Sequence, residues 1–162
     1  MFHLQKLNFR SDLPKVTVSL LPEVLKHFES NVQTGNSTES GGQLFGTFAS
    51  PHNVLVSLAT GPQKKYHRFR NFLRLDLETD QKEINQFFKQ GFHYLGDWHT
   101  HPVSNPTPSV RDRNTSKSRF AKSEHELTAM LMVIVGTTIT SENLWVGLQN
   151  KTTLVELSGV RI

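Results

Sequence analysis

The stretch 97-DWHTHPVSNPTPSVRD-112 places two histidines one residue apart, turns through three prolines, and then supplies a serine and an aspartate. We predict that residues 93–101 form a strand leading into this stretch. Alternate side chains of a strand share a face, so His99 and His101 project in the same direction. Two imidazoles on one side of a strand can bind one ion.

The residues after the prolines predict a helix from Ser109 to about Ala121. Ser109 is a natural N-cap, and Asp112 falls in the first turn beside it. With His99 and His101, Asp112 supplies two nitrogens and one oxygen, which matches a catalytic zinc site with water in the fourth position. Taken alone, a Ser-x-x-Asp sequence is more often only a cap, and a His-x-His pair is more often not bound to metal.

Composition limits the class of protein. The chain has 162 residues, of which 36% are hydrophobic and 20% charged, so we expect one globular domain spanning residues 1–162. Cysteine is absent, which excludes disulfides and thiolate metal ligands. The longest apolar run, 130–135, is too short to span a bilayer, and the first residues do not resemble an export signal. We therefore expect a cytoplasmic protein without membrane contact.

The charge is basic, with a formal net charge of +4 and an isoelectric point near 9.5. Ten of the 18 Lys and Arg residues lie in the two basic stretches 64–74 and 111–122. Solvated surface is the simpler interpretation, and steering of an acidic partner is the alternative. No nucleic-acid-binding motif accompanies the charge, which argues against such a partner. The oligomeric state is left open.

Hydrophobic periodicity and turn residues predict the remaining elements. Helices are expected at 22–33 and 80–90, the second with Asp80 and Glu83 as a capping box and Gly91 just after its end. Strands are expected at 15–20, 43–49, 53–59, 129–137, 142–149 and 151–157. Interspersed helices and short hairpins favour an α+β fold with a mixed, mainly antiparallel sheet flanked by helices.

Two separated motifs resemble the signature of the JAB/JAMM (MPN) zinc metalloprotease family. The order His-x-His-Pro, six residues, Ser, two residues, Asp is filled at every position, by His99, His101, Pro102, Ser109 and Asp112. The upstream segment 39-ESGGQLFG-46 supplies the glutamate that the family carries in a Glu-x-Gly-Gly-x-Leu-x-Gly setting, here Glu39. The sequence is also similar in length to the small bacterial deconjugating peptidases of CBASS anti-phage operons.

The resemblance implies a function for each motif residue. His99, His101 and Asp112 would bind Zn²⁺, Glu39 would take a proton from zinc-bound water and return it to the leaving amine, and Ser109 would help to stabilise the oxyanion. The expected reaction cleaves a peptide or isopeptide bond after the C-terminal tail of a ubiquitin-like or similarly conjugated protein. In a CBASS operon that protein would be a cGAS-like nucleotidyltransferase.

The sequence is also compatible with other functions. The same chemistry would process a ubiquitin-like modifier or a sulfur-carrier precursor, and an MPN fold can also serve as a non-catalytic interaction scaffold. For a protein substrate with an extended C-terminal tail, we expect the tail to pair beside strand 43–49 and the folded body to contact 64–70. A nucleotide or DNA hydrolase is disfavoured because the several carboxylates of a two-metal site are missing.

Overall fold

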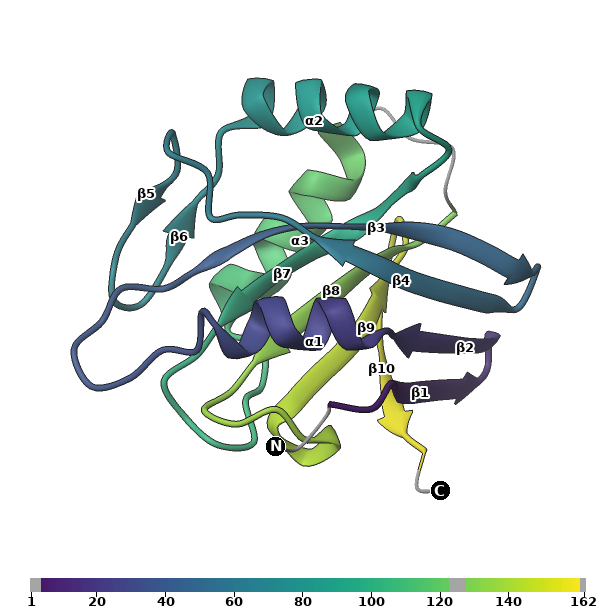
Figure 1. The fold of residues 1–162 in the computed structure, drawn as a ribbon, viewed down its shortest axis with the longest axis horizontal. Helices are drawn as coiled ribbons and strands as arrows, with labels where there is room; N and C mark the ends of the chain where they lie inside the picture. The colour runs from purple at the N-terminus through teal and green to yellow at the C-terminus, as the bar shows by residue number, and fades with distance from the viewer. Residues whose placement is uncertain (1–3, 123–127, 161–162) are drawn as a thin grey trace.

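A closed sheet is the main feature of the computed structural model, which describes residues 4–122 and 128–160 (Figure 1). Three helices lie outside this sheet. In chain order the elements are β1 (Leu7–Asp12), β2 (Lys15–Leu20), α1 (Pro22–Glu29), β3 (Gly41–Ser50), β4 (Asn53–Ala59), β5 (His67–Arg68), β6 (Leu73–Arg74), α2 (Leu77–Lys89), β7 (His93–Thr100), α3 (Val110–Lys122), β8 (Met130–Val135), a 3₁₀ turn (Ser141–Asn143), β9 (Leu144–Gln149) and β10 (Leu154–Gly159).

The strand order around the closed sheet is β1-β10-β9-β8-β7-β3-β4-β2. The pairs β7–β8 and β2–β4 are parallel, and the other neighbours are antiparallel. The fold is therefore a closed eight-stranded mixed barrel with short helices outside it. The predicted α+β class, a mixed, mainly antiparallel sheet flanked by helices, is wrong.

Strand β1 explains this difference. Its sequence LNFRSD was not predicted to be a strand, although Phe9 is buried with 1% of its surface exposed. The whole of β1 pairs with β2, and its middle pairs with β10, where Phe9 lies opposite Gly159. Without β1, strands β2 and β10 would each have an open edge, and the sheet would not close. One missed strand therefore changes the class.

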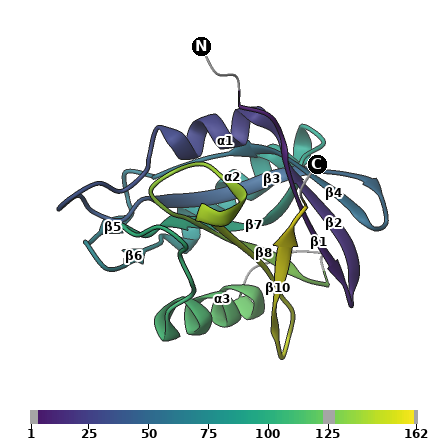
Figure 2. The ribbon, with the colours of Figure 1, turned by 90° about the horizontal axis from the view of Figure 1, so that it is seen from below.

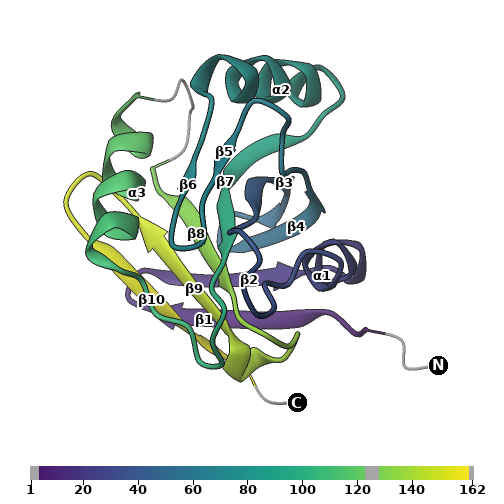
Figure 3. The same ribbon diagram turned by 90° about the vertical axis from the view of Figure 1, so that its left-hand side faces the viewer.

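The helices lie on different sides of the barrel. Helices α1 and α3 are on opposite sides in Figure 2, and α2 lies along the top of Figure 3. Helix α2 begins one turn earlier than predicted because Asp76, not Asp80, is its N-cap and accepts a hydrogen bond from Thr79 N at 3.1 Å. Asp80 is instead fully buried. Gly91, with φ of +91°, follows the helix as predicted.

Strands β3 and β7 position the site that the sequence predicts. They are antiparallel neighbours, and Gly41 at the start of β3 lies opposite His99 near the end of β7. Because β3 also pairs with β4, both of its edges are occupied over residues 44–46. A substrate tail therefore cannot pair along the whole of 43–49, and the prediction is wrong for residues 44–46.

The hairpin of β5 and β6 is a separate two-stranded sheet, which projects at the left of Figure 1. None of the helices in residues 4–122 and 128–160 is long and apolar enough to cross a membrane.

Candidate metal centre and active site

The two histidines of the motif occupy the end of β7 and the residue after it. The backbone N–H of His101 donates to Val135 O at 2.9 Å, which holds this end of the chain against β8. The rings of His99 and His101 project together, with their centroids 5.1 Å apart. Thr100 between them is fully buried and hydrogen-bonds to the opposite side, as strand alternation predicts.

Asp112 comes from the first turn of α3. The Asp112 N–H donates to Ser109 Oγ at 3.0 Å, and Asp112 Oδ2 accepts from Ser109 N at 2.9 Å, which is the predicted reciprocal cap. This cap brings the carboxylate back toward β7. Asp112 Oδ1 lies 3.2 Å from His99 Nε2, and Oδ2 lies 3.1 Å from His101 Nε2.

These three side chains fit a tetrahedral metal ion. Ligand atoms of His99, His101 and Asp112 all lie within 4.8 Å of one another. Ligands at about 2.0–2.2 Å from a tetrahedral ion are separated by roughly 3.3 Å, and each histidine nitrogen lies about that far from one oxygen of Asp112, His99 from Oδ1 and His101 from Oδ2. Within the described residues, His99 Nε2 is buried and has no hydrogen-bond partner of acceptable geometry. A buried nitrogen without a partner is expected where a cation is the missing partner.

Electrostatics distinguish the two carboxylates of the site. Burial raises the pKa of Asp112, but contacts with His101 and His99 outweigh it and hold the pKa well below its usual range. Glu39 is 3% exposed, and burial together with the negative charge of Asp112 raises its pKa from 4.5 to about 8, against the opposing effect of Arg111. Asp112 is therefore held in its anionic form, whereas the raised pKa of Glu39 suits a group that exchanges a proton near neutral pH.

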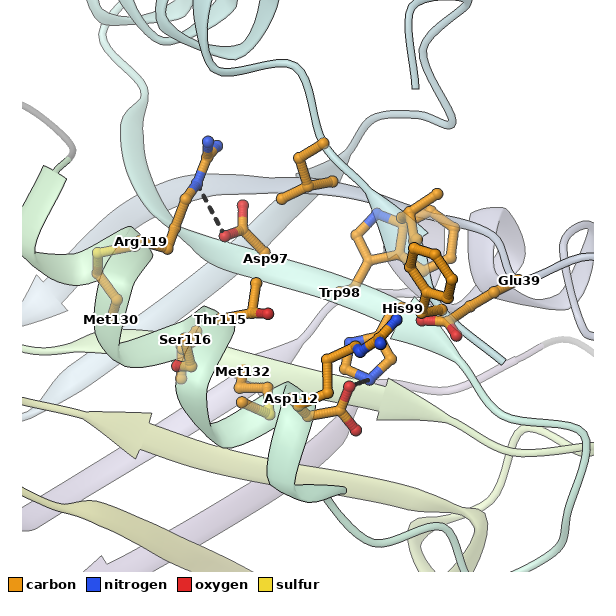
Figure 4. Close-up of a pocket in the computed structure, with 15 residues that line it drawn as sticks. Glu39, Asp97, Trp98, His99, Asp112, Thr115, Ser116, Arg119, Met130 and Met132 are labelled. Atoms are coloured by element: carbon orange, nitrogen blue, oxygen red, sulfur yellow. Dashed lines mark hydrogen bonds and ion pairs between the residues drawn. The ribbon is translucent and has the colours of Figure 1, made fainter. Parts of the chain in front are cut away.

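Glu39, His99 and Asp112 line one cavity, whereas His101 does not line it. The volume of the cavity is about 610 Å³, including the part that is open to solvent. In Figure 4, Glu39, His99 and Asp112 gather at one end of the cavity, and Asp97 and Arg119 lie at the other. A second, more open groove adjoins it between α3 and the segment that contains β6. Ser109 is exposed and does not line the cavity.

The backbone around Glu39 is fixed by residues near β5. Glu39 N donates to Phe69 O at 2.7 Å, and Arg68 Nε donates to Glu39 O at 3.0 Å. The same guanidinium donates from Nη2 to Ser40 Oγ at 2.6 Å. A Cβ added at Gly41 would lie 2.5 Å from Leu73 Cδ2, so glycine lets the β6 side chain pack closely here. Arg68 therefore supports the site, which differs from the predicted contact with a substrate body.

A buried polar network joins the segment that contains Glu39 to the strand that carries His99. Thr100 Oγ1 accepts from Ser40 N at 2.9 Å and donates to Gln33 Oε1 at 3.1 Å. Gln33 Nε2 in turn donates to Arg70 O at 2.8 Å. Because Gln33 and Thr100 are almost completely buried, these bonds fix the loop of Glu39 relative to the histidine strand.

Sequence reasoning missed these supporting residues for different reasons. Arg68 lies on a strand of two residues, which is too short to show a periodicity. Asp97 was interpreted as a solvated strand residue, but it accepts hydrogen bonds from Tyr94 and Arg119. The sequence does contain a signal for Asp97 and Arg119. Asp97 shares its strand face with His99, and Arg119 shares a helix face with Asp112. Trp98, interpreted as core filling, is buried as predicted.

Comparison with known proteins agrees with this geometry. Residues 22–146 match the family model Prok-JAB, described as prokaryotic homologs of the JAB domain. The chain is 31% identical over 159 residues to a CD-NTase/cGAS isopeptidase of Escherichia coli (strain TW11681), covering 96% of both chains. It is 35% identical over 116 residues to a CD-NTase/cGAS isopeptidase of Pseudomonas aeruginosa (strain BWHPSA011 / Pa011), covering 69% of this chain and 72% of the relative.

A solved structure supports the fold alone. Protein DSY2949 from Desulfitobacterium hafniense superposes with a TM-score of 0.57 at 16% identity, covering 84% of both chains. The match to the family model spans most of the chain, including Glu39 just before β3, His99 and His101 at and just after the end of β7, and the helix that carries Asp112. The chain therefore belongs to the family of prokaryotic homologs of the JAB domain.

Proposed function

We propose that the protein is a zinc-dependent isopeptidase that releases a nucleotidyltransferase of the CD-NTase/cGAS type from a protein to which its C-terminal tail is joined. In this role it would reverse conjugation in bacterial anti-phage (CBASS) defence. The observation that carries the proposal is the cluster of His99, His101 and Asp112, of which His99 and Asp112 line one cavity with the buried carboxylate of Glu39. The names of its relatives support the choice of substrate.

Zinc is the metal that suits this ligand set best. Two imidazoles and one carboxylate leave a coordination position free, which is typical of catalytic zinc sites, and the chain has no cysteine to close it. When bound, Zn²⁺ would supply Lewis-acid chemistry: it would polarise the scissile carbonyl and lower the pKa of water, so that a hydroxide nucleophile is available near neutral pH.

Glu39 is the proposed general base and acid. Its carboxylate accepts a proton from the attacking water as the new C–O bond forms, and donates that proton to the amine nitrogen as the C–N bond breaks. The products are a free C-terminal carboxylate and an amine. The raised pKa of Glu39, about 8 in the metal-free protein, suits a group that must both take and return a proton.

Ser109 is proposed to assist the oxyanion through its hydroxyl group. Ser109 Oγ already accepts the helix-capping hydrogen bond from Asp112 N, and its O–H has no acceptor among the described residues. We also propose that the substrate tail enters along the groove between β6 and α3, which adjoins the cavity. Residues 1–162 would act as one domain, because β1 and β10 pair within the sheet that holds β3 and β7.

The test uses a purified CD-NTase whose C-terminal carboxylate is joined to a lysine side chain of a reporter protein. Zinc-loaded protein should release both proteins with intact ends, as seen by electrophoresis and intact mass. His99→Ala and Asp112→Ala should abolish release, whereas His52→Ala, at an exposed residue in the turn between β3 and β4, should not affect it. A linear fusion of the same tail measures whether α-amines are also accepted.

Two results would contradict the proposal. If zinc-loaded protein leaves both substrates intact while binding metal at this site, the proposed substrate is wrong. If His99→Ala and Asp112→Ala cleave as fast as His52→Ala, the proposed metal centre is wrong.

A further inference from the structure

Helix α3 carries Asp112 but has an unusually small apolar surface. Between Val110 and Phe120 its sequence RDRNTSKSR contains no apolar side chain, and Val110 itself is 77% exposed. The buried residues of α3 are Arg119 and Phe120. Most helices are held by an apolar stripe, so the position of α3 must depend on contacts near its two ends.

Arg119 supplies most of the polar contacts at the C-terminal end. Its Nη2 lies 2.7 Å from Asp80 Oδ2 of α2, and its Nε donates to Asp97 Oδ2 of β7 at 3.1 Å. When the side-chain amide of Gln43 on β3 is oriented so that its nitrogen donates to Glu83, its oxygen accepts a hydrogen bond from Arg119 Nη2 at 2.9 Å. Arg119 Nε also lies 3.3 Å from Tyr94 Oη. One guanidinium therefore ties α3 to α2, β3 and β7.

The geometry connects this cluster directly with the metal ligands. Arg119 follows Asp112 by seven residues, which is two helical turns and about 10 Å along the same helix face. Asp97 precedes His99 by two residues on the same strand face. Between these pairs, Thr115 and Ser116 of α3 line the cavity (Figure 4). Asp112 with His99, and Arg119 with Asp97, are therefore two contacts between α3 and β7, at opposite ends of the cavity.

We propose that Arg119 is a positioning residue, which fixes the distance between α3 and β7 at which Asp112 meets His99 and His101. The inference rests on the metal site of the proposed function and assigns to that site a residue that touches neither metal nor substrate. Arg119 is 5% exposed and has two carboxylate partners, so the planar fork of its guanidinium holds both helix and strand in one geometry.

Electrostatics alone predicts a different outcome. A guanidinium near a cation site repels the cation, so removal of its charge should tighten metal binding if charge is all that matters. Loss of positioning should weaken metal binding instead. Arg119→Met and Arg119→Lys separate the two effects, because lysine keeps the charge but cannot bond two carboxylates in the same fork.

The experiment measures the zinc dissociation constant of the purified full chain by competition with a chromogenic chelator. Arg119→Met and Arg119→Lys should each bind zinc about 10- to 100-fold more weakly, the usual effect of losing an outer-shell partner. Arg113→Met is the matched control, because Arg113 is exposed on the same helix and lines neither the cavity nor the groove. Its dissociation constant should stay unchanged. Cobalt-substituted protein gives a second readout, since its visible absorption reports the ligand geometry.

Folding is monitored by thermal unfolding, and binding is measured well below the lowest midpoint. Arg119→Met leaves the buried Asp80 and the partly buried Asp97 without their cation, so Arg119→Lys carries the test if the methionine variant does not fold. Wild-type zinc affinity and cobalt absorption in Arg119→Lys would overturn the inference, as would tighter binding by Arg119→Met. If the wild-type chain binds no zinc, the proposed function fails together with the inference. If the wild-type chain binds zinc and Arg119→Lys binds it equally well, only the inference about Arg119 fails.

Discussion

Glu39→Gln should stabilise the metal-free protein while it abolishes turnover. The carboxylate is 3% exposed, and burial and the charge of Asp112 raise its pKa from 4.5 to about 8. Below pH 4.5 the side chain is protonated in both the folded and the unfolded chain. As the pH rises from 4.5 to 8, the unfolded chain ionises first, so the free energy of unfolding falls. Above pH 8 this destabilisation is constant.

The size of the effect follows from the shift. Each pKa unit corresponds to about 1.36 kcal/mol, and pH 7 lies about 2.5 units above the ordinary pKa, which gives about 3 kcal/mol. Glutamine has nearly the same shape and no charge, so it removes this destabilisation. The metal-free Glu39→Gln variant should therefore gain about 3 kcal/mol at pH 7 relative to wild type, and almost nothing at pH 4.5.

The measurement is urea unfolding of chelator-treated proteins at several pH values between 4.5 and 8.5. Cleavage by the zinc-loaded variant is measured alongside, and should fall by about 10²- to 10⁴-fold with the zinc content unchanged. Glu29→Gln, at an exposed position at the end of α1, is the control for a change of net charge. A stability difference that does not grow with pH would refute the raised pKa, and near-normal cleavage would refute the role as base.

Three further predictions concern the rest of the site. Arg68→Ala should lower cleavage of a conjugate and of a short tail peptide equally, because it loses the bonds to Glu39 O and Ser40 Oγ, whereas the exposed Lys64→Ala should spare the peptide. Similar rates for both variants on the peptide would contradict this. Ser109→Ala should cost about 1 kcal/mol of stability from the lost cap and also lower kcat. An unchanged kcat would mean that Ser109 only caps the helix. Removal of metal by a chelator should abolish cleavage reversibly, with activity restored by zinc, and persistent activity would argue against a metal mechanism.

The sequence predicts the local geometry of the site well, because that geometry depends on short spacings. Strand alternation places His99 and His101 on one face, and the cap between Ser109 and Asp112 turns the carboxylate toward them. Their catalytic roles stay predictions. Glu39 is far from this segment in sequence, and the pairing of β3 with β7 brings the two together. Only the resemblance to a family placed Glu39 in the predicted site.

The closed sheet could not be predicted in the same way. Its closure depends on β1 pairing with β10, a contact between Phe9 and Gly159 at opposite ends of the chain. No local period carries information about such a partner. The start of α2 was predicted wrongly because Asp80 and Glu83 have the spacing of a capping box, although Asp80 is buried against Arg119. Tertiary contact decides which of two similar carboxylates becomes the cap.

The pairing of β1 with β10 also determines when the molecule can finish folding. The first and last strands of the sheet are about 150 residues apart in sequence, since Phe9 meets Gly159. During synthesis, β1 leaves the ribosome early and must wait for β10 with one edge unpaired. The long loop that this contact closes makes it a slow step in folding. A nascent chain can therefore form β3, β7 and α3 before the sheet closes, and it reaches its final shape only once the last strand has been translated.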